Sequence, residues 1–229
     1  MSTLWHGRFG AGPAEELLAY TASLPRARPR TSCPSVVHIG DSTSEGLISS
    51  DYLPDASQRI PARYQAIGVR NVHMEVVGAT SIVEEYEGHP NAYKVAKRYR
   101  AAGYNGCWVI ALGTNDTADV AVGSNVGLAE RITRMMSVIG SQPVLWITVK
   151  SLLSSGPYSE HDMSQWDQAL AAAAGKYPNM RVYDWASVVQ DQWFINDKIH
   201  FTSAGYAARG ELIADALAAA FPAGRNQSG

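Results

Sequence analysis

Four short stretches of the 229-residue sequence carry residue types suited to acyl transfer. They contain Ser42 in GDS (40–42), Gly78, Asn115 in GTND (113–116), and Asp197 with His200 in NDKIHF (196–201). Serine is a poor nucleophile at neutral pH unless a base accepts its proton, and histidine, with an ordinary pKa near 6.5, is suited to that task. Asp197 precedes His200 by three residues, so it can bind the other ring nitrogen and stabilise the imidazolium.

A serine mechanism also needs hydrogen-bond donors for the oxyanion of its tetrahedral intermediate. The candidates are the backbone N–H groups of Ser42 and Gly78 and the side-chain amide of Asn115. One such donor lowers the barrier by about 3–4 kcal/mol.

Each of these residues also has a purely structural interpretation. Ser42 can cap the helix that follows it, and Asn115 or Asp116 can cap another. Asp197 can pair with a neighbouring lysine, and His200 can be an ordinary loop histidine. A single GDS or DxxH is weak evidence. Their joint occurrence at strand ends is a rarer coincidence and favours a site.

The elements that must position these residues alternate from Cys33 onward. Apolar runs predict strands over 35–40, 72–78, 107–113, 144–149 and 180–185. Helical spacing occurs over 128–139, over 164–174 with Ser164 as N-cap, and from Ser203 onward. This alternation predicts a mostly parallel sheet with helices on both faces, in which sites form beyond the carboxyl ends of the strands.

The four stretches together resemble the SGNH (GDSL-type) hydrolase superfamily over residues 35–221. The resemblance implies an α/β fold: a flavodoxin-like three-layer α/β/α sandwich, with a five-stranded parallel sheet in the order 2-1-3-4-5 and a single domain. It also implies Ser42 as nucleophile, Gly78 and Asn115 in the oxyanion hole, and Asp197 with His200 as the acid–base pair.

A narrower resemblance links residues 165–185 and 196–206 to the extracellular SGNH domains of bacterial cell-envelope O-acyltransferases. Two positions depart from the common pattern: Lys198 stands where many members have glycine, and Asp167 stands where asparagine is common. The resemblance implies an esterase that removes or transfers a short acyl group on a carbohydrate or another small ester. A dedicated O-acyltransferase and a non-catalytic glycan-binding module are the alternatives.

The substrate surface is expected to include Asp41, Thr114 and Trp166. Tyr158 is a second aromatic candidate for a sugar-binding face. The irregular stretch 151–165 follows a strand end, where loops commonly shape a pocket. His38 lies inside an apolar strand and is read as structural.

Composition excludes several function classes. The net charge is only −2, which does not suggest a nucleic-acid-binding surface. No metal-binding spacing or dinucleotide fingerprint occurs, so neither a metal nor a cofactor is expected. No run approaches the roughly 18 apolar residues of a membrane span. The expected partner is a small acyl ester or an acylated glycan, and the protein is expected to be a monomer.

Three segments are predicted. Residues 1–32 combine an amphipathic helix over 14–24 with a connector rich in proline and arginine, and residues 4–25 resemble the N-terminus of argininosuccinate lyases without that enzyme's catalytic motifs. We interpret this segment as an appendage or leader. A catalytic domain follows over 33–222, and residues 223–229 form a disordered tail. The N-terminus has no signal-peptide pattern, as a chain trimmed of its leader also would not.

The two cysteines bear on location. Cys33 lies nine residues before Ser42 and Cys107 eight before Asn115, on strands expected to be neighbours. Equal lengths at about 3.3 Å per residue place both cysteines at the opposite end of the sheet. A disulfide is then plausible if the Cα atoms lie within about 7 Å. It implies an extracellular or cell-envelope location, whereas two separate buried thiols leave the cytoplasm open.

Overall fold

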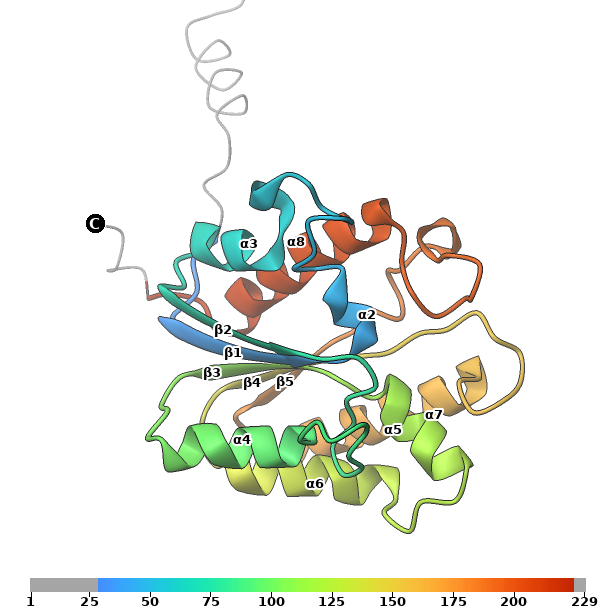
Figure 1. The fold of residues 1–229 in the computed structure, drawn as a ribbon. Coiled ribbons are helices and arrows are strands. Elements are labelled where there is room, and N and C mark those ends of the chain that lie inside the picture. Colours follow the sequence, from blue (N-terminus) through green and yellow to red (C-terminus); the bar gives the residue numbers. More distant parts are fainter. Residues whose placement is uncertain (1–28, 225–229) are drawn as a thin grey trace, which may run out of the picture.

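The computed structural model describes residues 29–224, whose centre is a five-stranded sheet (Figure 1). All neighbouring strands are parallel, and the order is β2-β1-β3-β4-β5. The strands are β1 (Ser35–Gly40), β2 (Asn71–Val76), β3 (Cys107–Ala111), β4 (Val144–Ile147) and β5 (Met180–Tyr183). This confirms the predicted strand order. The predicted helix over 14–24 and residues 225–229 of the predicted tail lie outside the described residues.

Helices cover both faces of the sheet and form three layers, as predicted (Figure 1). On one face lie α2 (Ser42–Glu45), α3 (Ile60–Ala66) and α8 (Ser203–Ala220), with short 3-10 turns at η1 (Ala56–Gln58) and η2 (Asp191–Trp193). On the other lie α4 (Ala92–Ala101), α5 (Thr114–Ala121), α6 (Leu128–Ile139) and α7 (Glu160–Ala174). The described residues form one domain.

Two hydrophobic cores lie on opposite faces of the sheet because successive side chains of a strand point in opposite directions. In β1, Val36 joins the core under α3 and α8, whereas Val37 and Ile39 join the core over α4, α6 and α7. Both faces of β3 are covered, so all five of its residues are buried. This double burial explains the continuous apolar runs in the sequence.

Several predicted boundaries were wrong. Helix α7 begins at Glu160, because Ser159 rather than Ser164 accepts a hydrogen bond from the backbone N–H of Asp162. The irregular stretch therefore ends at residue 159. Four strands end two residues earlier than predicted, β2 at Val76, β3 at Ala111, β4 at Ile147 and β5 at Tyr183, and Gly78 lies in the turn beyond β2.

The end of the sheet away from the strand carboxyl ends holds two cross-links. Cys33 and Cys107 form a disulfide, with their Cα atoms 5.7 Å apart. Thr31 forms an isolated antiparallel bridge with Pro222, just beyond α8. None of the helices within residues 29–224 is long and apolar enough to cross a bilayer.

Candidate active site

Ser42 is the first residue of α2, directly after the turn that ends β1. The N-cap of this helix is Asp41, whose carboxylate accepts hydrogen bonds from the Thr43 backbone N–H (2.9 Å) and hydroxyl (2.7 Å). The interpretation of Ser42 as the cap is therefore wrong. A Cβ on Gly40 would lie 2.6 Å from Cβ of Ser44, so only glycine lets α2 begin this close to the strand.

The Ser42 hydroxyl instead meets His200. Ser42 Oγ lies 2.8 Å from His200 Nε2, and His200 Nδ1 lies 2.7 Å from Asp197 Oδ2. The other carboxylate oxygen of Asp197 accepts hydrogen bonds from the backbone N–H groups of Ile199 and His200, both at 2.9 Å. The structure thus brings the serine, the histidine and the acid into one hydrogen-bonded line.

A tight loop explains how residues only three apart can form this pair. The Ile195 backbone N–H donates to the His200 carbonyl, and Phe194 and Phe201 form an isolated antiparallel bridge beyond it. Burial opposes ionisation of Asp197, but hydrogen bonds from the backbone of His200 and Ile199 and from the His200 ring outweigh it and lower the pKa of Asp197. The acid therefore remains a carboxylate at neutral pH.

The three expected oxyanion donors come from neighbouring segments. Asn115 does not cap α5, because the N-cap is Gly113 and no side chain caps this end. Its Nδ2 donates to the Thr80 carbonyl (3.1 Å) and makes a longer contact with Asp41 Oδ2 (3.5 Å). Gly78 lies two residues before Thr80, and its N–H meets no acceptor within residues 29–224. The N–H of Ser42 lies in the first turn of α2, where helical N–H groups lack partners within the helix.

A comparison with sequence families decides what this arrangement belongs to. The GDSL-like Lipase/Acylhydrolase family matches residues 38–208, which include Ser42, Gly78, Asn115, Asp197 and His200. The chain belongs to the GDSL-like lipase/acylhydrolase family. It is an enzyme of the esterase and acylhydrolase type.

Several proteins with solved structures share the fold. A carbohydrate acetylesterase from Sinorhizobium meliloti is 18% identical with a TM-score of 0.62, covering 82% of this chain and 99% of the other. An aryl esterase from M. smegmatis is 16% identical with a TM-score of 0.63, and the match covers 82% of this chain and 99% of the other. The C-terminal catalytic domain of a peptidoglycan O-acetyltransferase from Streptococcus pneumoniae is 15% identical with a TM-score of 0.59. This match covers 82% of this chain and 92% of the other. No curated protein matches the chain.

Three residues expected on the substrate surface of this GDSL-like site lie beneath it instead. Asp41 and Trp166 are fully buried, and Thr114 is 3% exposed. Trp166 packs under the turn at Gly113, where φ is 142° and an added Cβ would lie 2.2 Å from the indole nitrogen. The expectation that they bind substrate directly was wrong, because their side chains are buried. Half-buried Tyr158 does reach the site, with its hydroxyl 3.4 Å from Asn115 Oδ1.

Both departures from the common family pattern have a visible structural setting. Lys198 adopts a φ of 65°, a left-handed conformation that favours glycine. Its carbonyl accepts a hydrogen bond from the Leu152 N–H (2.9 Å), which joins the Asp197–His200 loop to the loop before α7. Asp167 Oδ1 accepts a hydrogen bond from the Val149 N–H (3.0 Å), and burial raises the pKa of Asp167 to about 7.

Sequence reasoning missed a buried ionic cluster beside the site. Arg131 of α6 is buried against Glu84 and Asp116, within hydrogen-bond distance of both. Burial raises the pKa of Asp116 to about 7, against the opposing effects of the Ile82 N–H and Arg131. One signal was available, because Arg131 stands three residues after Leu128 and next to Ile132 on the inward face of its helix.

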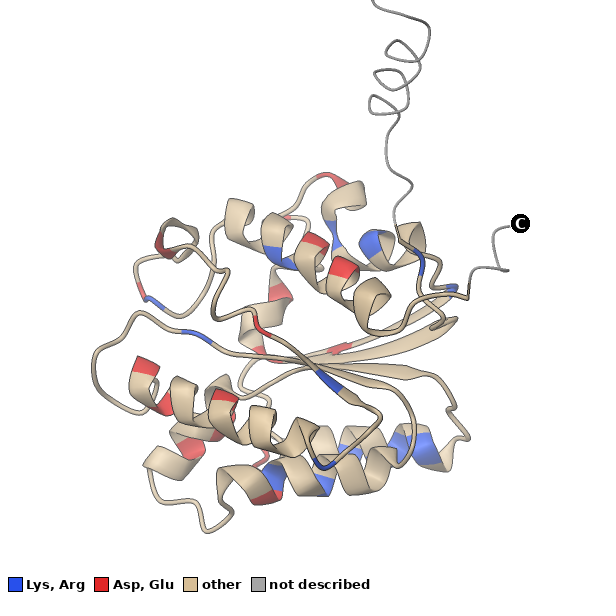
Figure 2. Cartoon of the chain, turned by 180° about the vertical axis from the view of Figure 1, so that it is seen from behind, with Lys and Arg blue, Asp and Glu red and all other residues tan. Residues whose placement is uncertain are grey.

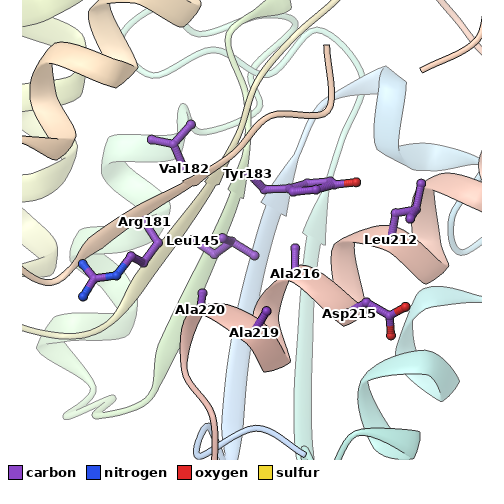
Figure 3. A pocket seen from close by; sticks show the side chains of 9 residues that line it. All are labelled: Leu145, Arg181, Val182, Tyr183, Leu212, Asp215, Ala216, Ala219 and Ala220. Atoms are coloured by element: carbon purple, nitrogen blue, oxygen red, sulfur yellow. The ribbon is translucent and has the colours of Figure 1, made fainter. Parts of the chain in front are cut away.

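A groove lined mainly by apolar side chains lies elsewhere, between β5 and α8 (Figure 3). Its volume is about 510 Å³, and Leu145 and Tyr183 of the sheet face Leu212 and Ala216 of α8 across it. None of the residues of the serine–histidine–aspartate line takes part in its lining. The charged residues are also unevenly distributed, because basic residues gather along α4 and acidic residues at the start of α7 (Figure 2).

Proposed function

We propose that the chain is a serine esterase that removes or transfers a short, acetyl-like acyl group on a carbohydrate or another small ester. The observation that carries this proposal is the continuous line from Ser42 Oγ through the His200 ring to the Asp197 carboxylate, with contacts of 2.8 and 2.7 Å. A structural serine or loop histidine has no need of this alignment.

In the proposed reaction, Ser42 Oγ attacks the ester carbonyl while His200 Nε2 takes its proton. The imidazolium, stabilised by Asp197, then gives this proton to the departing alcohol, which leaves an acyl ester on Ser42. Water or a second hydroxyl repeats the sequence in reverse, and the acid or the new ester is released. His200 returns to its neutral form at the end of both acylation and deacylation.

The oxyanion of both intermediates is proposed to bind the N–H groups of Ser42 and Gly78 and the Asn115 amide. One Nδ2 hydrogen of Asn115 is held by the Thr80 carbonyl. The other makes only the 3.5 Å contact with Asp41, so it is available to the oxyanion. Donors fixed before the reaction stabilise developing charge without reorganisation.

Two features support a small polar substrate. The fold is similar to that of a carbohydrate acetylesterase and of a peptidoglycan O-acetyltransferase domain. The loop over residues 151–159 holds four serines and one glycine and is joined to the Asp197–His200 loop through Lys198. Such side chains suit hydroxyl-rich groups better than a long acyl chain.

The nucleophile is tested with a fluorophosphonate probe and a small aryl acetate. The wild-type protein is expected to be labelled at Ser42 and to release acetate, and Ser42→Ala is expected to lose both properties. Ser44→Ala is the matched control, since Ser44 lies in the same helix with a buried hydroxyl that has no partner. Turnover by Ser42→Ala, or an unlabelled wild-type protein, opposes the proposal, and the second result favours a non-catalytic glycan-binding module.

A dedicated O-acyltransferase is the second candidate, favoured by the similarity to the peptidoglycan O-acetyltransferase domain. Both activities share the acyl-enzyme and differ in whether water or a sugar hydroxyl accepts the acyl group. An acetyl donor is supplied with a panel of glycans, and the products are identified by mass. Acetylated glycan supports the transferase, whereas free acetate alone across the panel opposes it.

We also propose that the protein works outside the cytoplasm, in the cell envelope or beyond it. The Cys33–Cys107 disulfide supports this, because disulfides persist mainly in oxidising compartments. Protein from the native host is alkylated without reduction and weighed. An unmodified mass is expected, and two alkylated cysteines contradict the proposed location.

A further inference from the structure

Arg131 uses every donor of its guanidinium although its side chain is fully buried. Nε donates to the Val126 carbonyl (2.9 Å), Nη1 to Glu84 Oε2 and Asp116 Oδ1 (2.9 Å), and Nη2 to Glu84 Oε1 (2.6 Å) and Ser124 Oγ (2.8 Å). A guanidinium has five N–H groups, so none is left without a partner. Such a rigid fork fixes the positions of the groups around it.

These contacts join three separate segments. Arg131 belongs to α6, Asp116 to the first turn of α5, and Glu84 to the loop that follows β2. Asp116 Oδ1 accepts a second hydrogen bond, from the Ile82 backbone N–H (3.0 Å). The same carboxylate therefore holds the loop directly and also binds the arginine that holds it at Glu84.

The held segments carry two of the proposed oxyanion donors. Asn115 precedes Asp116 in α5, and its amide binds the Thr80 carbonyl two residues before Ile82. Gly78 is the second residue of this loop. Next to it, Ala79 has a φ of 57°, a conformation that costs energy for any residue but glycine and persists only where the surroundings enforce it.

On the basis of the proposed function, we infer that Arg131 is a positioning residue for the oxyanion hole. Through Asp116 and Glu84 it sets the spacing between the Gly78 N–H and the Asn115 amide. Arg131 does not touch the reacting atoms. A buried ionic cluster commonly stabilises a fold no better than apolar residues of similar volume, so stability alone is a weak reason for an arginine here.

The test is a double-mutant cycle between Arg131→Lys and Asn115→Ala, with kcat and KM measured for a small aryl acetate. Lysine keeps the charge but cannot make five directed hydrogen bonds. We expect Arg131→Lys to lower kcat at least about tenfold with little change in KM, since displacement of a group by about 1 Å can cost about 100-fold. In the Asn115→Ala background the same change is expected to lower kcat clearly less than in the wild type, because one of the two donors whose spacing Arg131 sets is already absent.

Arg134→Lys is the matched control, because Arg134 lies on the same helix but pairs with Glu130 at the surface. It is expected to leave kcat and KM unchanged. If Arg131→Lys does not fold, the same double-mutant cycle is measured with Glu84→Gln in its place, because the Glu84 side chain is partly exposed. Unfolding of each variant is followed by circular dichroism, so that loss of fold is separated from loss of rate.

Two results overturn the inference. Equal losses in both backgrounds show that Arg131 does not act through Asn115, and a rise in KM at constant kcat places its effect on substrate binding. Failure of the proposed function is distinguishable, because the wild type then shows no turnover that depends on Ser42, and an unchanged kcat in Asn115→Ala alone removes Asn115 from the oxyanion hole. A large loss in Asn115→Ala together with equal losses in both backgrounds overturns only the positioning role.

Discussion

Lys198 adopts a backbone conformation that ordinarily belongs to glycine, one residue after the proposed acid Asp197. A left-handed conformation costs a residue with a side chain about 1–2 kcal/mol, and glycine relieves this cost. Part of the relief is offset by the greater conformational freedom of glycine in the unfolded chain. We therefore expect Lys198→Gly to raise the free energy of unfolding by about 0.5–1 kcal/mol. Denaturant titration measures the change.

Lys198→Ala is the control for this prediction, because alanine lacks the lysine side chain yet meets the same backbone restriction. It is expected to give no comparable gain. If both variants gain equally, the cause is the lysine side chain, and the backbone explanation is wrong.

Asp197 provides a second prediction at the scale of single residues. Asn in place of Asp197 keeps the size of the side chain but cannot stabilise the imidazolium or reliably hold the His200 tautomer. We expect Asp197→Asn to lower kcat by about 10³–10⁴-fold for a small ester. KM is expected to change little, since Asp197 faces His200 rather than the substrate. A loss below about tenfold contradicts the proposed role.

At the scale of elements, Asp167 links α7 to the end of β4 and makes stability depend on pH. Burial raises its folded pKa to about 7, above its ordinary value of 3.8, so the folded protein holds a proton that the unfolded chain has lost. The protonated Asp167 therefore stabilises the folded state fully below about pH 4, and this stabilisation is lost as the pH rises to about 7.

Asp167→Asn removes this dependence while keeping an oxygen for the Val149 N–H. The variant is expected to be more stable than the wild type by about 2 kcal/mol at pH 8, after allowance for partial exposure, and the difference is expected to shrink towards pH 4. Urea unfolding at several pH values measures it. A difference independent of pH shows that Asp167 is not the titrating group.

The five strands could be predicted from the sequence because apolar runs are local signals, although four of the predicted strands extend two residues too far. The start of α7 could not, because both Ser159 and Ser164 offer a capping hydroxyl. That error hid the phase of the helix, in which Met163, Trp166 and Leu170 form the buried face. Trp166 belongs to this buried face, so it does not line the substrate surface.

The residues of the site also fall into those that could be predicted from the sequence and those that could not. Ser42, Asn115 and His200 could be found because each follows a strand or a turn directly. The Arg131 cluster could not, because its members lie up to 47 residues apart and meet only after α5, α6 and the loop after β2 have packed. A charged residue on an otherwise apolar helix face was its only local trace.

At the scale of the whole molecule, the disulfide closes a long stretch of chain. Cys33 and Cys107 are 74 residues apart, and a cross-link over that length stabilises a protein by about 4 kcal/mol in the chain-entropy model. Cys33→Ala with Cys107→Ala is expected to lower Tm by about 10 °C. Calorimetry measures the change, with the reduced wild type as the comparison. An unchanged Tm contradicts the prediction.

The bridge between Thr31 and Pro222 brings the two ends of the described region together at the end of the sheet remote from Ser42. A short peptide joining residues 31 and 222 therefore spans little distance, and new chain ends can be opened in a surface loop without cutting the site. A circularly permuted enzyme of this kind should retain turnover. The same geometry makes these two positions suited to immobilisation on a solid support, with the reactive rim facing the solution.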